Sequence, residues 1–134
     1  KGVDIIFVAA GASGNGVFKV AKETEGVYCI GCDVDQYDDG AHGNNNIVLT
    51  SALKIMDKNV RLQLEKVKSG TFQGENALLG YDTDSTGYVS ENGRCQLSEE
   101  TIREIGETLE KVKTGHIVPA SSNNKLSPEN FIGL

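Results

Sequence analysis

The sequence has no tryptophan and little proline, methionine or aromatic content. Its 134 residues include two Pro, one Met and 6% aromatic residues. No apolar run approaches the roughly 18 residues of a transmembrane helix. The sequence also lacks the basic, apolar and small-residue segments of a signal peptide, and it opens at Lys1 without an initiator Met. These features favour a segment of a longer protein over a membrane-spanning chain or a chain that still carries its signal peptide.

Basic charge is also scarce, which limits the possible partners. The sequence has 13 Lys and Arg against 19 Asp and Glu, for a formal net charge of −6. Nucleic acids and anionic membrane surfaces are bound by basic faces, so we expect neither as a direct partner. A chain of this length is typical of one domain with a single core.

The three cysteines do not form an obvious redox or metal motif. Cys29 and Cys32 have the C-x-x-C spacing of a redox pair or half a zinc site. They lie in an apolar run, however, where strand alternation sends them to opposite faces. No second C-x-x-C follows, and Cys95, His42 and His116 are isolated in the sequence. We therefore expect small buried hydrophobic residues here, with no metal and no cofactor.

The first part of the chain predicts a βαβ unit. Residues 3–10 form a nearly continuous apolar run, typical of a strand covered on both faces. Helical spacing follows over 17–23 and stops at Gly26, and residues 27–31 and 47–50 are apolar again. Strand, helix and strand with tight loops imply a parallel sheet and an α/β fold.

The second part predicts two helices. Ser51 is a candidate cap for a helix that ends before Gly70, and Ser98 for a second that ends before Gly115. Between them, residues 77–80 favour a short strand. We place the domain at residues 1–119 and a polar tail at 120–134. The expected apolar positions of the two helices are Leu53, Met56, Val60, Leu64 and Val67, then Ile102, Ile105, Leu109 and Val112.

A glycine-bearing loop, residues 11–16, follows the first predicted strand. Glycines there allow a sharp turn and close approach of a ligand, and the following helix offers unpaired N–H groups. The dinucleotide fingerprint is G-x-G-x-x-G, with an acidic residue about 20 positions later. This loop has the different spacing G-x-x-G-x-G, although Asp33 does close the next strand. It is either a ligand loop or a tight βα turn that simply requires glycine.

Asp33 and Asp35 follow the second predicted strand. Ligands of open α/β sheets lie beyond the carboxyl ends of the strands, and alternation places both carboxylates on one side. A carboxylate accepts two hydrogen bonds from vicinal hydroxyls, so a ribose or sugar site is indicated. Solvated loop acids are the alternative. The acidic residues 37–40 lack the 12-residue pattern and closing Glu of a calcium loop.

Lys54 is the third candidate. If Ser51 caps the following helix, Lys54 lies in its first turn, where a cation opposes the helix dipole. This placement suggests that Lys54 reaches over the strand ends toward Asp33 or a ligand, with a solvated surface lysine as the alternative. No nucleophile and base set accompanies these candidates, which favours binding over catalysis.

Taken together, four segments resemble one family. They are residues 4–17, 27–36, 48–51 with Lys54, and 113–119, and they look like the basic membrane protein family of substrate-binding lipoproteins. That family includes the purine nucleoside receptors of ABC importers. The resemblance covers about residues 2–119 and implies a parallel-sheet, three-layer lobe of the type I periplasmic binding protein fold. The chain resembles most of the C-terminal lobe.

The resemblance also implies ligand contacts. Asp33 corresponds to an acid that binds ribose hydroxyls and Lys54 to a lysine that reaches the same ligand. Phe7, which spacing alone makes a core residue, corresponds to an aromatic that stacks on the base. Gly11 and Ala12 begin the loop beside the ligand, although the family usually has two adjacent glycines there. Residues 37–46 also look longer and more polar than is usual.

The expected function is therefore that of a binding module and not of an enzyme. The chain is expected to be one lobe of an ABC transporter substrate-binding lipoprotein that captures a nucleoside for import, with a purine nucleoside as the preferred ligand. The resemblance implies an ABC permease as partner and an extracytoplasmic protein held at the bacterial membrane by a lipid anchor. Three other hypotheses remain open at this point. They are a Rossmann-type NAD(P)-binding or nucleotide-binding enzyme domain, a sugar-sensing domain of a regulator, and a structural domain without a ligand.

Overall fold

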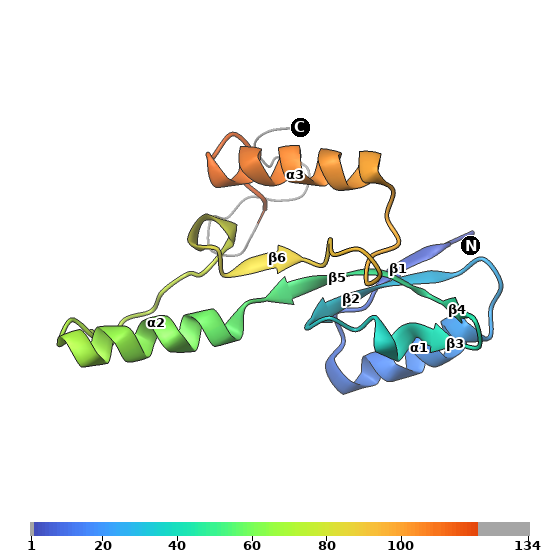
Figure 1. Ribbon diagram of the computed structural model, residues 1–134, viewed down its shortest axis with the longest axis horizontal. Helices are drawn as coiled ribbons and strands as arrows, with labels where there is room; N and C mark the ends of the chain where they lie inside the picture. Colours follow the sequence, from blue (N-terminus) through green and yellow to red (C-terminus); the bar gives the residue numbers. More distant parts are fainter. Residues whose placement is uncertain (1, 121–134) are drawn as a thin grey trace.

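A four-stranded sheet organises the chain. The computed structural model describes residues 2–120. The strand order is β1-β2-β5-β6, comprising β1 (Ile5–Phe7), β2 (Tyr28–Asp33), β5 (Val48–Lys54) and β6 (Thr86–Tyr88). The first three strands are parallel and β6 is antiparallel to β5 (Figure 1). The predicted βαβ unit and α/β fold are thus confirmed.

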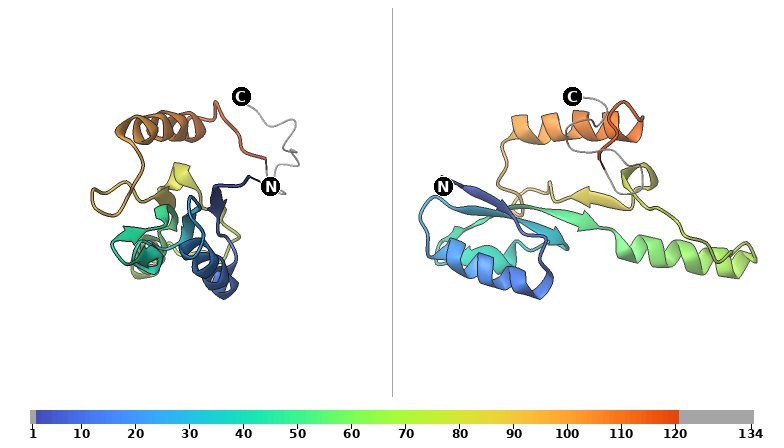
Figure 2. Two further views of the ribbon diagram at one scale, coloured as in Figure 1. Left: turned by 90° about the vertical axis from the view of Figure 1, so that its right-hand side faces the viewer. Right: turned by 180° about the vertical axis from the view of Figure 1, so that it is seen from behind.

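Helices lie on both sides of this sheet. In Figure 1, α1 (Gly14–Lys22) lies below the sheet and α3 (Glu99–Lys113) above it, and Figure 2 shows the same order of layers from two further directions. Helix α2 (Met56–Ser69) extends beyond the end of the sheet. None of the described helices is long and apolar enough to cross a membrane. The short elements are η1 (Gly11–Ser13), η2 (Asp38–Gly40), β3 (Ala41–His42), β4 (Asn45–Asn46) and η3 (Tyr81–Thr83).

The core lies between α1 and one face of the sheet. Its buried members come from α1, from β2 and from the residues around β1 and β5. Cys29 is fully buried there, as expected, whereas Cys32 is only half-buried, so the expectation is wrong for Cys32. All three cysteines have free thiols. The core residues are Val8, Phe18, Ala21, Cys29, Ile47 and Val48.

The other face of β1 is open, so the expectation that this strand is covered on both faces is wrong. Ile5 and Phe7 are 47% and 54% exposed, and Tyr28, paired with Ile5, is also exposed. Helix α3 packs over β6 instead, where the Tyr88 hydroxyl donates to the Ile102 carbonyl at 3.3 Å. The same exposure contradicts the core position that spacing alone gives Phe7.

The expected helix start at Ser51 is also wrong. Ser51 lies in the middle of β5 and is fully buried, and α2 begins five residues later at Met56. Strand pairing on both sides of β5, with β2 and β6, overrides the local capping signal. Leu53 is therefore a strand residue. The helix ends as predicted before Gly70, whose φ of +73° suits glycine.

The strand expected at residues 77–80 is wrong, because these residues form no regular structure. The strand of this region is β6, which pairs with residues 52–54 of β5. The Ser98 cap is confirmed: its hydroxyl oxygen accepts a hydrogen bond from Thr101 N at 3.1 Å. The α2 positions Met56, Val60, Leu64 and Val67 are more than half exposed. Most of the polar tail, residues 121–134, lies outside the described residues.

Close packing at Gly31 generates a stability prediction. A Cβ atom at Gly31 would lie 2.5 Å from Ser51 Oγ and 3.0 Å from Gln36 Cβ. We expect Gly31→Ala to lower the free energy of unfolding by about 1–3 kcal/mol, because β2 and β5 must separate. The matched control is Gly106→Ala in α3, where no atom lies within 4 Å. It should raise stability by up to about 1 kcal/mol. Urea unfolding measures both, and an unchanged midpoint for Gly31→Ala contradicts this packing.

Candidate functional site

The carboxyl ends of β1, β2 and β5 meet around a pocket of about 330 Å³. This is the edge at which open α/β sheets bind ligands, and the volume lies at the lower end of the usual range for small-molecule sites. The lining comes from the chain after β1, the end of β2 with its following turn, and the end of β5. These residues are Val8, Ala9, Ala10, Gly11, Gly14, Cys32, Asp33, Val34, Gln36 and Lys54.

Asp33 and Lys54 form an ion pair at this pocket. Lys54 Nζ lies 2.8 Å from Asp33 Oδ1. The two residues are the last of β2 and β5, and the parallel register pairs Asp33 with Leu53, the neighbour of Lys54. The expectation that Lys54 reaches Asp33 is therefore confirmed. Its expected place in a helical first turn is wrong, because β5 continues to Lys54.

The backbone at Asp33 has an unusual conformation. Its φ of +74° lies in the left-handed region, which few residues other than glycine adopt. Two hydrogen bonds hold the turn that follows. Gln36 N donates to Ser51 Oγ at 3.0 Å, and Gln36 Oε1 accepts from Cys32 N at 2.9 Å. Such conformations persist where the surrounding structure fixes them, and here Gln36 joins the turn to β5 and back to β2.

Both members of the ion pair are charged at neutral pH. The hydrogen bond from Lys54, followed by that from Cys32, holds the pKa of the Asp33 carboxyl below its usual value. The same bond to Asp33 raises the pKa of Lys54. Burial, followed by the bond to Asp33, raises the pKa of the Cys32 thiol. The pocket thus offers a carboxylate acceptor, an ammonium donor and a protonated thiol, a set suited to binding hydroxyl groups.

The glycine loop lies directly beside this pair. Gly11, with φ of +52°, begins η1, and α1 starts at Gly14. A Cβ atom at Gly14 would lie 2.8 Å from Val8 Cγ1, so the loop packs closely on the strand it follows. Both glycines line the pocket, as a ligand loop requires.

The structure does not place every predicted residue in the pocket. Gly11, Asp33 and Lys54 come together there, whereas Phe7 and Ala12 lie outside its described lining. Phe7 is the last residue of β1, directly before the lining residue Val8, and Ala12 directly follows Gly11. The expectation that Asp35 faces the same side as Asp33 is wrong, because Asp35 pairs with Arg94.

Sequence reasoning missed Gln36 and Arg94. A glutamine after two aspartates gives no signal of its own, since its role depends on contacts with Cys32 N and Ser51 Oγ. Arg94 reaches Asp35 across 59 positions in the sequence, a distance at which a single sequence carries no pairing signal. Within residues 2–120 no group of three His, Cys, Asp or Glu is arranged to hold a metal ion.

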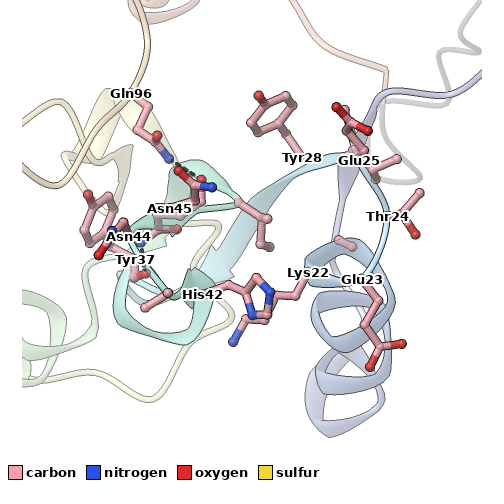
Figure 3. Close-up of a pocket in the computed structure, with 17 residues that line it drawn as sticks. Lys22, Glu23, Thr24, Glu25, Tyr28, Tyr37, His42, Asn44, Asn45 and Gln96 are labelled. Atoms are coloured by element: carbon pink, nitrogen blue, oxygen red, sulfur yellow. Dashed lines mark hydrogen bonds between the residues drawn. The ribbon is translucent and has the colours of Figure 1, made fainter.

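A second, larger hollow lies at the opposite edge, where β2 and β5 begin. It measures about 760 Å³ and is lined by residues 21–28 and 41–47 with Tyr37 and Gln96 (Figure 3). The Gln96 side chain lines this hollow, and its amide donates hydrogen bonds to the carbonyls of Asn46 and Val48. This hollow contains none of the predicted ligand residues, so the smaller pocket with its ion pair remains the candidate site.

The sheet order, the layers and the pocket at the carboxyl edge are those of an α/β lobe, consistent with a lobe of a periplasmic binding protein. Two solved structures share this arrangement. One is a transcriptional activator of the comK gene from Bacillus halodurans (TM-score 0.72, 19% identity, 88% of this chain and 39% of the other). The other is an ABC transporter solute-binding protein from Aeropyrum pernix K1 (TM-score 0.65, 21% identity, 91% and 42%). At such identities they show the fold alone.

The family is shown by sequence. Residues 1–122 match the Bmp family model, described as ABC transporter substrate-binding protein PnrA-like, and the chain belongs to this family. Its members are solute-binding proteins of ABC transporters and not enzymes. The resemblance noted from the sequence segments is thereby confirmed.

Two curated relatives illustrate the match. The CD4+ T-cell-stimulating antigen of Listeria monocytogenes is 36% identical over 129 residues, covering 87% of this chain and 36% of the relative. The ABC transporter nucleoside-binding protein BmpA of Lactococcus lactis is 30% identical over 127 residues, covering 85% and 34%. The chain thus spans little more than a third of the length of these relatives.

The ion pair generates a titration prediction. Lys54→Met should return the pKa of Asp33 toward its ordinary value, because the main group that lowers it is removed. A carboxyl whose pKa is lower in the folded chain than in the unfolded chain stabilises the fold at any pH above its unfolded-state pKa. This stabilisation is lost as pH falls through the folded-state pKa, here below about pH 4. That acid-dependent change should become smaller in Lys54→Met. Carboxyl-carbon NMR titration measures the pKa directly.

The matched control for this titration is Lys58→Met. Lys58 pairs with Asp84, whose pKa is lowered chiefly by that hydrogen bond. The control should raise the pKa of Asp84 and leave that of Asp33 unchanged. An Asp33 titration that is the same with and without Lys54 contradicts the ion pair.

Proposed function

We propose that this chain is the ligand-binding lobe of an ABC transporter substrate-binding protein that captures a nucleoside for import, with purine nucleosides preferred. The observation that carries the proposal is the Asp33–Lys54 pair at the carboxyl edge of the sheet, with both side chains partly exposed beside an open pocket. Membership of the family supports the transport role, and the name of the Lactococcus lactis relative supports the ligand class.

The proposed chemistry follows from the two charges. In the proposed complex, the Asp33 carboxylate accepts hydrogen bonds from the vicinal ribose hydroxyls, and the Lys54 ammonium donates to one of the same oxygens. Hydrogen bonds to charged groups are the stronger kind, contributing about 1.5–3 kcal/mol each. Because the pair is solvent-exposed, its own interaction is weak, so little free energy is lost when a ligand shares it.

The preference for a purine rests on Phe7 and on the glycine loop. Phe7 is 54% exposed at the end of β1, beside the start of the pocket lining. Stacking of a base on an aromatic ring contributes about 1–3 kcal/mol, and the larger purine has the larger face. In the proposal Gly11 and Ala12 lie beside the ligand, and the absence of a side chain at Gly11 allows close approach.

The partner and location are part of the same proposal. An ABC transporter substrate-binding family supports a membrane permease that accepts the ligand. The proposal places the protein outside the cytoplasm, held at the membrane by a lipid anchor. The net charge of −6 agrees with a protein that binds neither nucleic acid nor an anionic membrane surface directly. The NAD(P)-enzyme hypothesis has less support, because the family is not one of enzymes and the glycine loop lacks the fingerprint spacing.

An amide NMR titration of the chain tests this function. Inosine, added to about 20 mM because one lobe supplies only part of a site, should shift the amides of Gly11, Asp33 and Lys54 with a millimolar Kd. Asp33→Asn should weaken binding about tenfold or more, since one charged acceptor is lost. Asp84→Asn is the matched control, because Asp84 also has a positive φ and pairs with a lysine, but away from the pocket.

Besides the absence of any inosine response, two results would contradict the proposal. One is a saturable response to NADH around Gly14 with none to inosine, which would indicate a dinucleotide site. The other is an inosine response that Asp33→Asn and Asp84→Asn change equally, since the binding would then not depend on the pocket carboxylate.

A further inference from the structure

The loop between β6 and α3 is fixed to β5 on both sides of Arg94. Val89 N donates to the Ser51 carbonyl at 2.9 Å, and Gln96 N donates to the Leu49 carbonyl at 2.7 Å. The Gln96 side chain adds a bond to the Val48 carbonyl at 2.6 Å. Arg94 therefore projects from a short segment whose two ends are bonded to the central strand of the sheet.

The Arg94 guanidinium binds two carboxylates of the turn after β2. Its Nε contacts Asp35 Oδ2, and its two terminal nitrogens lie 3.3 Å and 3.0 Å from the oxygens of Asp38. Its central carbon lies 5.4 Å from the ring centroid of Tyr37, within cation–π range. Three residues of one turn, Asp35, Tyr37 and Asp38, thus contact a single side chain.

Asp35 is also bound from within the turn. Its other oxygen accepts a hydrogen bond from Tyr37 N at 2.9 Å. Partial burial disfavours the charged carboxylate, but the bonds from Arg94 and Tyr37 N outweigh it, and the pKa of Asp35 is lowered. An isolated surface ion pair contributes little, whereas a planar guanidinium shared by two carboxylates restricts the turn geometrically.

Asp33 of the candidate site belongs to the same turn. Asp33 begins it with φ of +74°, and Gln36 joins its middle to Cys32 and Ser51. We propose that Arg94 is a positioning residue of the ligand site, which through Asp35 and Asp38 holds residues 33–38 so that Asp33 faces Lys54 and the pocket. Arg94 does not line the pocket in the described part of the chain. This role rests on the proposed function, because ligand binding is the activity that it supports.

A double-mutant cycle in the full 134-residue chain tests the proposal. The variants are Arg94→Gln, Asp35→Asn and their combination, each titrated with inosine by amide NMR. We expect Arg94→Gln to weaken binding about three- to tenfold and Asp35→Asn by no more than that, because Arg94 still binds Asp38. The combination should weaken binding by less than the product of the two single effects, since the two residues share a contact. Arg94→Lys, which keeps the charge but not the planar group, should restore part of the affinity. The matched control is Arg103→Gln, which breaks an exposed pair with Glu107 in α3 and should leave Kd unchanged.

A second readout needs no ligand. In Arg94→Gln the amide signals of Cys32, Gln36 and Tyr37 should shift, and these amide protons should exchange with solvent faster. Each of the three N–H groups donates a hydrogen bond that forms part of the turn or ties it to β5. In Arg103→Gln they should not change. Additive losses of affinity, or unchanged turn amides in Arg94→Gln, would overturn the positioning role. If the unaltered chain binds no inosine, the proposed function fails, and the amide readout alone decides whether Arg94 holds the turn.

Discussion

The parallel pairing of β2 with β5 is the constraint on which the site depends. It brings Asp33 and Lys54, 21 positions apart in the sequence, to the same edge of the sheet. The pairing requires glycine at position 31, where Ser51 Oγ and Gln36 leave no room for a side chain. The same serine accepts a hydrogen bond from Gln36 N, in the turn after Asp33. Strand packing and the turn that carries Asp33 therefore depend on the same side chains, Ser51 and Gln36.

The titratable groups of the candidate site have pKa values shifted away from neutrality. The site combines an ionised carboxylate, a charged lysine and a thiol whose pKa is raised, so none of these groups is poised to move a proton near neutral pH. This agrees with a family of solute-binding proteins. The fold alone could not decide the matter, since a transcriptional activator and a solute-binding protein both share it.

The sequence predicted the fold class well because hydrophobic periodicity reports local structure directly. It predicted the first helix, the Ser98 cap and the glycine ends of α2 and α3. It failed at Ser51, where pairing with two neighbouring strands outweighs the preference of serine for a helix cap. Of the site, Asp33 follows from a strand end and Gly11 from glycine chemistry. Lys54 was predicted from a helix start that does not exist, because β5 continues to this residue. Arg94 and Gln36 were not predicted, because their roles arise only from contacts made in the folded chain.

The most direct test of nucleoside binding at the Asp33–Lys54 pair is a crystal structure of the chain with a purine nucleoside. We expect the ligand to lie at the carboxyl edge of the sheet, with its ribose hydroxyls within hydrogen-bond distance of the Asp33 carboxylate and of Lys54 Nζ. A nucleoside seated instead in the larger hollow at the opposite edge, with the Asp33–Lys54 pair untouched, would contradict it.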